Sequence, residues 1–131
     1  MSEQQPVEAV PNESGVLVEG QPGTVVERVG MAGSLQCYVE IAVAHYAGRW
    51  YSSLSVQASH TGWSSPMVPR YSEGFEGVEL ARADAVRRVS KWLRGHQRSG
   101  DGSVRAAAGK LLDLMAKRWL EEVEEEPSPR G

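Results

Sequence analysis

The chain has 131 residues, 40% of them hydrophobic, which suffices for one domain with appendages and includes no run of 18 apolar residues to span a membrane. Its formal net charge of −3 is unevenly distributed, since residues 1–30 and residues 121–131 each carry five acids against one arginine. Residues 31–120 hold twelve Lys/Arg and seven Asp/Glu; this local charge of +5 excludes a uniformly acidic surface and indicates a polyanion or an acidic partner.

The composition divides the chain into three parts. Residues 1–33 form an acidic N-terminal arm with weak strands at Gly15–Val18 and Thr24–Val29, residues 34–120 form a single α+β domain, and residues 121–131 form an acidic C-terminal tail. The central part holds all four Trp, all four Tyr and the one Phe, so it can bury a modest core. A lone cysteine and an N-terminus without a basic start or an apolar run predict a cytoplasmic protein with neither disulfide nor signal peptide.

Two neighbouring segments predict an antiparallel hairpin. Leu35–Tyr46 and Trp50–Ala58 both alternate with the period of two that is typical of a half-buried strand. A slip by one residue would turn every apolar side chain to the other face, so the pattern fixes the register. The turn then falls on Ala47-Gly48, where glycine accepts a positive φ. The predicted pairs are His45–Trp50, Val43–Ser52, Ile41–Leu54 and Val39–Val56.

A long connection follows the hairpin. Ser59–Gly77 is rich in Ser, Gly and Pro and is expected to be a loop, in which either Met67–Tyr71 or Gly74–Val78 could add a third strand. Trp63 lies in its polar part, where an exposed tryptophan would be a contact residue for a partner. The alternative is that Trp63 folds back to close the core.

Two amphipathic helices complete the prediction. Apolar residues recur with the helical period from about Ala81 to Arg94 and from about Val104 to Val123. Gly95 is a plausible stop for the first helix, and Asp101 or Ser103 can cap the second. The predicted fold class is therefore α+β, an antiparallel hairpin or three-stranded sheet packed with two amphipathic helices.

The first helix carries a basic face. At 100° per residue, four cations fall within about 60° of one another and opposite the apolar seam, although the last belongs to the face only if the helix continues past Gly95. Such a stripe can follow nucleic-acid phosphates, dock an acidic protein, or be a solvated helix face. The four residues are Arg87, Lys91, Arg94 and Arg98.

The second face of the hairpin presents Tyr38, Tyr46 and Tyr51 among small residues. Exposed aromatic side chains on a sheet can stack single-stranded bases. The alternative is that the arm, a helix or a second copy of the chain covers this face.

No catalytic or metal motif accompanies these features. The three histidines and Cys37 lack metal-ligand spacing, no serine stands in GxSxG, and no glycines form a phosphate loop. We therefore predict a non-enzymatic protein without a cofactor. Catalysis would require His60 or His96 to lie within hydrogen-bond reach of a serine and an acid.

The segment from Gly48 to Arg94 resembles small uncharacterised phage and plasmid proteins, through GRWYSSLSVQASHTGWSSP and EGFEGVELARADAVRRVSKWLR. The element order is also similar to HicB-type antitoxin domains. That resemblance implies a degraded nuclease-like fold that binds a toxin, with an added segment that binds operator DNA. The Gly-Cys turn and Gly-Asp-Thr helix start of that family are absent here, where the chain reads Gly77-Val78-Glu79-Leu80-Ala81-Arg82, and no functional residue is carried over.

These observations favour a regulatory binding protein of mobile-element type that associates with nucleic acid through the basic helix face. The alternative is a protein-binding inhibitor or adaptor, of the antitoxin or anti-defence (anti-CRISPR) kind, acting through the acidic ends and Trp63. An open hairpin edge and an apolar C-terminal helix both favour a homodimer without requiring one.

Overall fold

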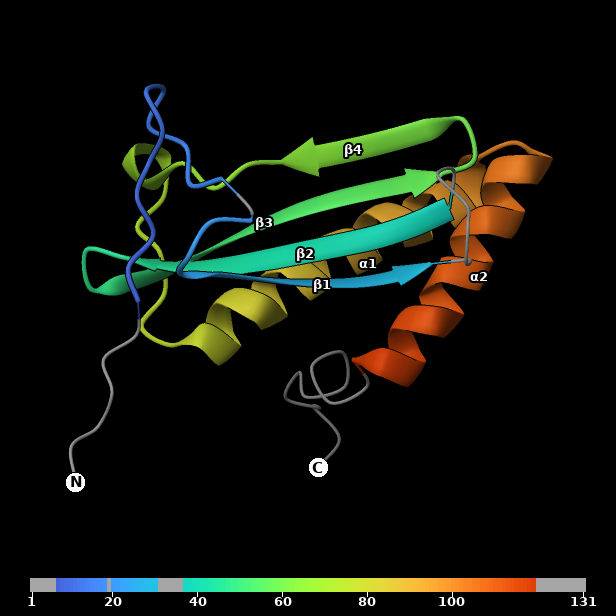
Figure 1. The fold of residues 1–131 in the computed structure, drawn as a ribbon. Coiled ribbons are helices and arrows are strands. Elements are labelled where there is room, and N and C mark those ends of the chain that lie inside the picture. The colour runs from blue at the N-terminus through green and yellow to red at the C-terminus, as the bar shows by residue number, and fades with distance from the viewer. Residues whose placement is uncertain (1–6, 19, 31–36, 120–131) are drawn as a thin grey trace.

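A computed structural model describes residues 7–18, 20–30 and 37–119 of the chain. These residues form an antiparallel four-stranded sheet in the order β1-β2-β3-β4, with two helices packed on one of its faces (Figure 1). The predicted α+β class is confirmed, with one more strand than the sequence indicated. The elements are β1 (Thr24–Gly30), β2 (Cys37–Tyr46), β3 (Arg49–Ala58), β4 (Thr61–Ser65), a 3-10 helix η1 (Pro69–Tyr71), α1 (Val78–Ser99) and α2 (Gly102–Arg118).

The central hairpin of β2 and β3 has the predicted register. His45 lies opposite Trp50, and the pairing continues without a bulge to Cys37 and Ala58. At the turn, Ala47 and Gly48 have φ values of 53° and 80°, the left-handed conformation that a two-residue hairpin turn needs at both positions.

The other two strands lie on either side of this hairpin. The segment predicted as the weak strand Thr24–Val29 forms β1 and pairs with β2 along seven residues. The third strand predicted at Met67–Tyr71 or Gly74–Val78 was wrong, because the chain returns directly after β3 and Thr61–Ser65 pairs with it. Ser59, at a φ of 60°, allows this tight return.

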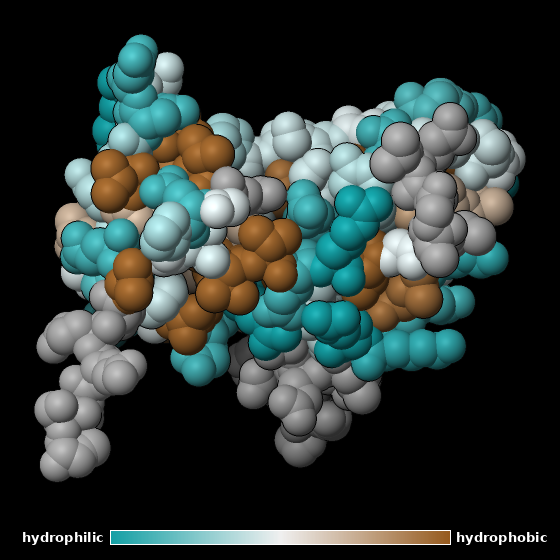
Figure 2. All heavy atoms as spheres, in the orientation of Figure 1, coloured by the Kyte–Doolittle hydropathy of each residue, from teal (hydrophilic) through white to brown (hydrophobic). Residues whose placement is uncertain are grey.

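Both faces of the sheet are used for packing. Alternate residues of β2 and β3 point toward the helices and build the main core, which closes on Trp119 at the end of α2. The intervening residues face the other side, where Ala9, Leu17 and Met67 cover Ala44 and Tyr51. Figure 2 shows hydrophobic side chains gathered over the end of the sheet that the N-terminal arm covers, beside a hydrophilic band.

The described part of the N-terminal arm belongs to the same packed unit. The Ala9 amide donates to the His45 carbonyl at 2.8 Å, and the Leu17 amide donates to the Met67 carbonyl at the same distance. The weak strand predicted at Gly15–Val18 is reduced to this single bridge at Leu17. The acidic tail predicted at 121–131 lies outside the described residues.

Both helices differ in length from the prediction. Gly95 does not stop the first helix, since α1 continues to Ser99, where the Gly100 amide donates to the His96 carbonyl. A glycine in a helix costs stability but keeps its backbone hydrogen bonds, so α1 can continue through Gly95. The second helix begins after Asp101, whose side chain accepts from the Val104 amide. Within the described residues, no helix combines the length and apolar character needed to cross a membrane.

One carboxylate joins β1 to both helices. Glu27 Oε1 accepts from Trp119 Nε1 at 2.7 Å and from Arg82 Nη2 at 2.8 Å, and Arg118 lies 3.9 Å away. Burial raises the pKa of Glu27, but the hydrogen bonds from Arg82 and Trp119 and the charges of Arg82 and Arg118 outweigh it, so its pKa lies below the ordinary 4.5. The charged form of Glu27 therefore stabilises the fold.

We expect Gly95→Ala to raise the free energy of unfolding by about 1 kcal/mol, because alanine favours the helix and its Cβ would meet nothing within 4 Å. Urea unfolding followed by circular dichroism measures the change. A destabilised variant would contradict the continuation of α1 through this position.

We expect Glu27→Gln to lower the free energy of unfolding by about 1 kcal/mol at pH 7, because the charge-assisted hydrogen bonds are weakened. The folded-state pKa of Glu27 is depressed, so its contribution is complete above 4.5 and is lost as the pH falls through the folded value. Urea unfolding over a pH series should show the two proteins converging in acid. A difference independent of pH would contradict this account.

Candidate nucleic-acid interface

The four predicted cations lie together on the exposed face of α1. Because α1 runs through Gly95 to Ser99, Arg98 stands on the same helix as the other three. All four are exposed, and the buried residues of α1 lie on the opposite side, against the sheet and α2. From Arg87 to Arg98 the helix rises about 16 Å. The basic face, defined by Arg87, Lys91, Arg94 and Arg98, is therefore a continuous surface feature.

The charges of the basic face are not balanced along α1. Residues 86–99 include five Lys/Arg and no Asp or Glu. Arg87 and Lys91, and likewise Arg94 and Arg98, stand four residues apart, a spacing at which like charges destabilise a helix by about 0.2–0.5 kcal/mol per pair. Among the described residues no ion pair involves Lys91, Arg94 or Arg98.

Helix polarity accounts for only part of this arrangement. Arg98 lies in the last turn of α1, where a cation interacts favourably with the helix dipole. The other three cations stand further from the helix end, and the dipole effect falls off within one turn. The helix therefore keeps a locally unfavourable charge arrangement on its solvent face.

Trp63 is not in a loop. It is the third residue of β4, opposite Val56, and its half-buried ring packs against the main core. Its indole stacks on that of Trp92 in α1, with ring centroids 6.2 Å apart and planes 22° from parallel. Of the two alternatives weighed for Trp63, the inward-packed one describes its position, with part of the ring still exposed.

The three tyrosines do not share an exposed face. Tyr51 is only 7% exposed and lies in the second core, with Tyr46 packed against it. Tyr38 is half-buried, its ring lies 4.4 Å from the guanidinium of Arg28, and its hydroxyl is 3.3 Å from the Ser55 hydroxyl. The described part of the N-terminal arm covers the Tyr46 and Tyr51 end of the face on which base stacking was predicted.

The structure adds an aromatic cluster that the sequence did not reveal. Trp92 and His96 lie one turn apart on α1, with ring centroids separated by 4.1 Å, and Trp63 extends the row from β4. The prediction ended this helix at about Arg94, before His96. Continuing the helical period past Gly95 would have placed His96 four residues after Trp92 on the same flank.

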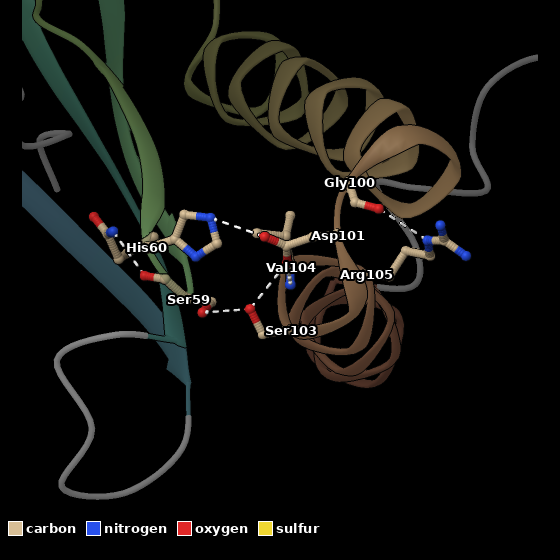
Figure 3. A network of polar contacts seen from close by, with 8 residues as sticks. Ser59, His60, Gly100, Asp101, Ser103, Val104 and Arg105 are labelled. Atoms are coloured by element: carbon tan, nitrogen blue, oxygen red, sulfur yellow. Dashed lines mark hydrogen bonds and ion pairs between the residues drawn. The ribbon is translucent and has the colours of Figure 1, made fainter.

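His45 Nδ1 lies 3.9 Å from Glu8 Oε2, and His60 makes a closer contact with an acid. Its Nε2 lies 3.1 Å from Asp101 Oδ2, which connects the β3–β4 turn to the junction between α1 and α2 (Figure 3). The Ser103 hydroxyl donates to the other oxygen of Asp101, and the Ser59 hydroxyl donates to Ser103. Within the described residues, no hydrogen bond joins a serine to His60 itself. His60 and Asp101 are 64% and 57% exposed, so the pair fastens two turns on an open surface.

The remaining candidates for site chemistry are not grouped. Cys37 is buried, and desolvation raises the pKa of its thiol although the charge of Lys110 acts in the opposite direction. Within the described residues, no three His, Cys, Asp or Glu side chains lie close enough to hold a metal ion.

We expect Asp101→Ala to lower the thermal unfolding midpoint, because α2 loses its N-cap and His60 loses its partner. The hydrogen bond from the Val104 amide, then that from Ser103, holds the pKa of Asp101 below its usual 3.8, so the capping group is the carboxylate. Asp101→Asn is the matched control, because asparagine caps helices equally well. Equal losses in both variants would assign the effect to the His60 pair.

Comparison with protein-family models, curated proteins and solved structures finds no match for this chain, so its relation to mobile-element proteins and HicB-type antitoxins stays a prediction.

Proposed function

We propose that this protein binds nucleic acid through the basic face of α1, as a non-catalytic regulatory protein. The observation that carries the proposal is the row of exposed cations along about 16 Å of helix, in a segment with no acidic residue. A row of this kind can neutralise successive phosphates and release their counterions, which is the main source of sequence-independent affinity for nucleic acid.

The local energetics support a role in binding. Like charges at helical spacing weaken α1, and of Lys91, Arg94 and Arg98 only Arg98, in the last turn, is placed to interact with the helix dipole. A polyanion along this face would remove the repulsion between Arg87 and Lys91 and between Arg94 and Arg98. Its affinity should therefore depend strongly on salt.

The protein-binding alternative relies on other parts of the chain. The acidic segment 121–131 lies outside the described residues, and Trp63 is stacked against Trp92 rather than projecting from a loop. No described contact favours this alternative, and it stays a prediction that affinity capture with the full chain would address.

The proposal predicts salt-dependent binding that α1 controls. Fluorescence anisotropy of labelled single- and double-stranded DNA and RNA should show binding at low salt. The double variant Arg94→Gln/Arg98→Gln should bind more weakly, and its slope of log K against log salt should be less steep by about 1.4 for single strands, or about 0.7 for each cation removed. Glutamine keeps a good helix propensity, so the fold should be retained.

The matched control is Lys110→Gln/Lys117→Gln, which removes the same charge from exposed positions of α2. This control should bind nearly as well as the parent protein. Equal weakening by both double variants would mean that overall charge, not the basic face, governs binding. No binding of any nucleic acid at low salt would end the proposal.

A further inference from the structure

A shallow groove lies beside the basic face, between β4 and α1. The side chains that line it include Trp63, Trp92 and His96 with Arg88 and Lys91, and Gly95 lies between them. Its volume of about 470 Å³ falls within the range of small-ligand sites, roughly 300–1,000 Å³. We call it the aromatic groove.

The rings of the aromatic groove are held in place by the main core and by the sheet. Trp63 and Trp92 both pack against the main core, and the pairing of β4 with β3 fixes the backbone of Trp63. The ring of Trp92 contacts those of both Trp63 and His96, with centroid distances of 6.2 Å and 4.1 Å. All three remain partly exposed, so the row is a preformed aromatic surface that needs little ordering to receive a flat ligand.

Gly95 keeps the groove open. A Cβ at this position would meet nothing within 4 Å, so the space above it is free. Glycine is among the least favourable residues in a helix interior, and the fold has no steric need for it here. A larger side chain at position 95 would project among the groove residues of the adjacent turns.

The charges around the groove select the ligand. Lys91 belongs to both the groove and the basic face, and Arg94 and Arg98 follow on the next turns of α1. Arg88 Nε donates a hydrogen bond to Asp84 Oδ2 at 2.9 Å, and Arg88 Nη1 lies 3.4 Å from the Ser65 hydroxyl. The charge of Arg88 is therefore already paired where it lines the groove. No acidic residue is among the described residues that line it. An aromatic ligand that carries phosphates matches this combination.

We propose that the aromatic groove receives an unstacked base of a single-stranded nucleic acid, whose backbone follows the basic face from Lys91 toward Arg98. This inference rests on the proposed function and specifies its substrate. Bases in a duplex are stacked inside the helix, so a base can enter the groove from a single strand or after costly extrusion. Stacking on aromatic side chains changes affinity roughly 5- to 150-fold per base.

The test compares Gly95→Leu with Gly95→Ala. Both favour the helix, but only leucine fills the groove, and circular dichroism checks that both variants are folded. The probes are a labelled single-stranded oligothymidylate, an abasic strand of equal length and a duplex. Gly95→Leu should weaken oligothymidylate binding by at least 5-fold and leave abasic-strand and duplex binding unchanged, whereas Gly95→Ala should match the parent protein.

Trp63→Leu gives an independent check, because it removes a ring but keeps an apolar side chain over the core. It should also lower oligothymidylate affinity selectively. One contrary result is that Gly95→Leu and Trp63→Leu leave oligothymidylate affinity unchanged while Arg94→Gln/Arg98→Gln weakens it. That result would reject base binding in the aromatic groove and keep the proposal that the basic face binds nucleic acid. Equal losses on all three probes would reject base binding in the groove as well. No binding of any probe by the parent protein would reject both proposals.

Discussion

The register of the β2–β3 hairpin is the constraint on which the rest of the structure depends. It brings Val39, Ile41, Leu54 and Val56 to one face, where they form the floor of the main core. The same alternation turns Ala42, Ala44 and Tyr51 to the opposite face, which the N-terminal arm must cover. A shift by one residue would exchange these two sets and leave neither the helices nor the arm a matching surface.

The orientation of α1 follows from that register. Its seam of Ala85, Val89 and Leu93 is buried against the sheet, so the side that bears the basic face is turned to solvent. The flank between these two sides meets β4, where Trp92 and His96 come beside Trp63. The candidate interface therefore has two parts. Core packing orients the basic face of α1, and the position of β4 brings Trp63 beside Trp92 and His96. In the function that we propose, the charges would supply affinity and the rings would supply selectivity for unstacked bases.

The polar contacts around this framework connect elements that the hairpin does not reach. Glu27 fastens β1 to both helices, and the His60–Asp101 pair joins the β3–β4 turn to the start of α2. Both contacts lie at the periphery of the main core. They connect the two helices to β1 and to the β3–β4 turn.

The sequence by itself determined the hairpin, its turn, the buried seams of both helices and the basic face, because each depends on a backbone period of 2 or 3.6 residues that neighbours in sequence express. It did not reveal β4, since Thr61–Ser65 contains little β-branched or alternating character. It also ended the first helix before Gly95, although α1 keeps its helical conformation through this residue. Only the tertiary structure decided that the arm covers Tyr51 and that Trp63 meets Trp92. Those contacts join residues far apart in the chain, and no local pattern specifies which of two apolar surfaces will cover the other.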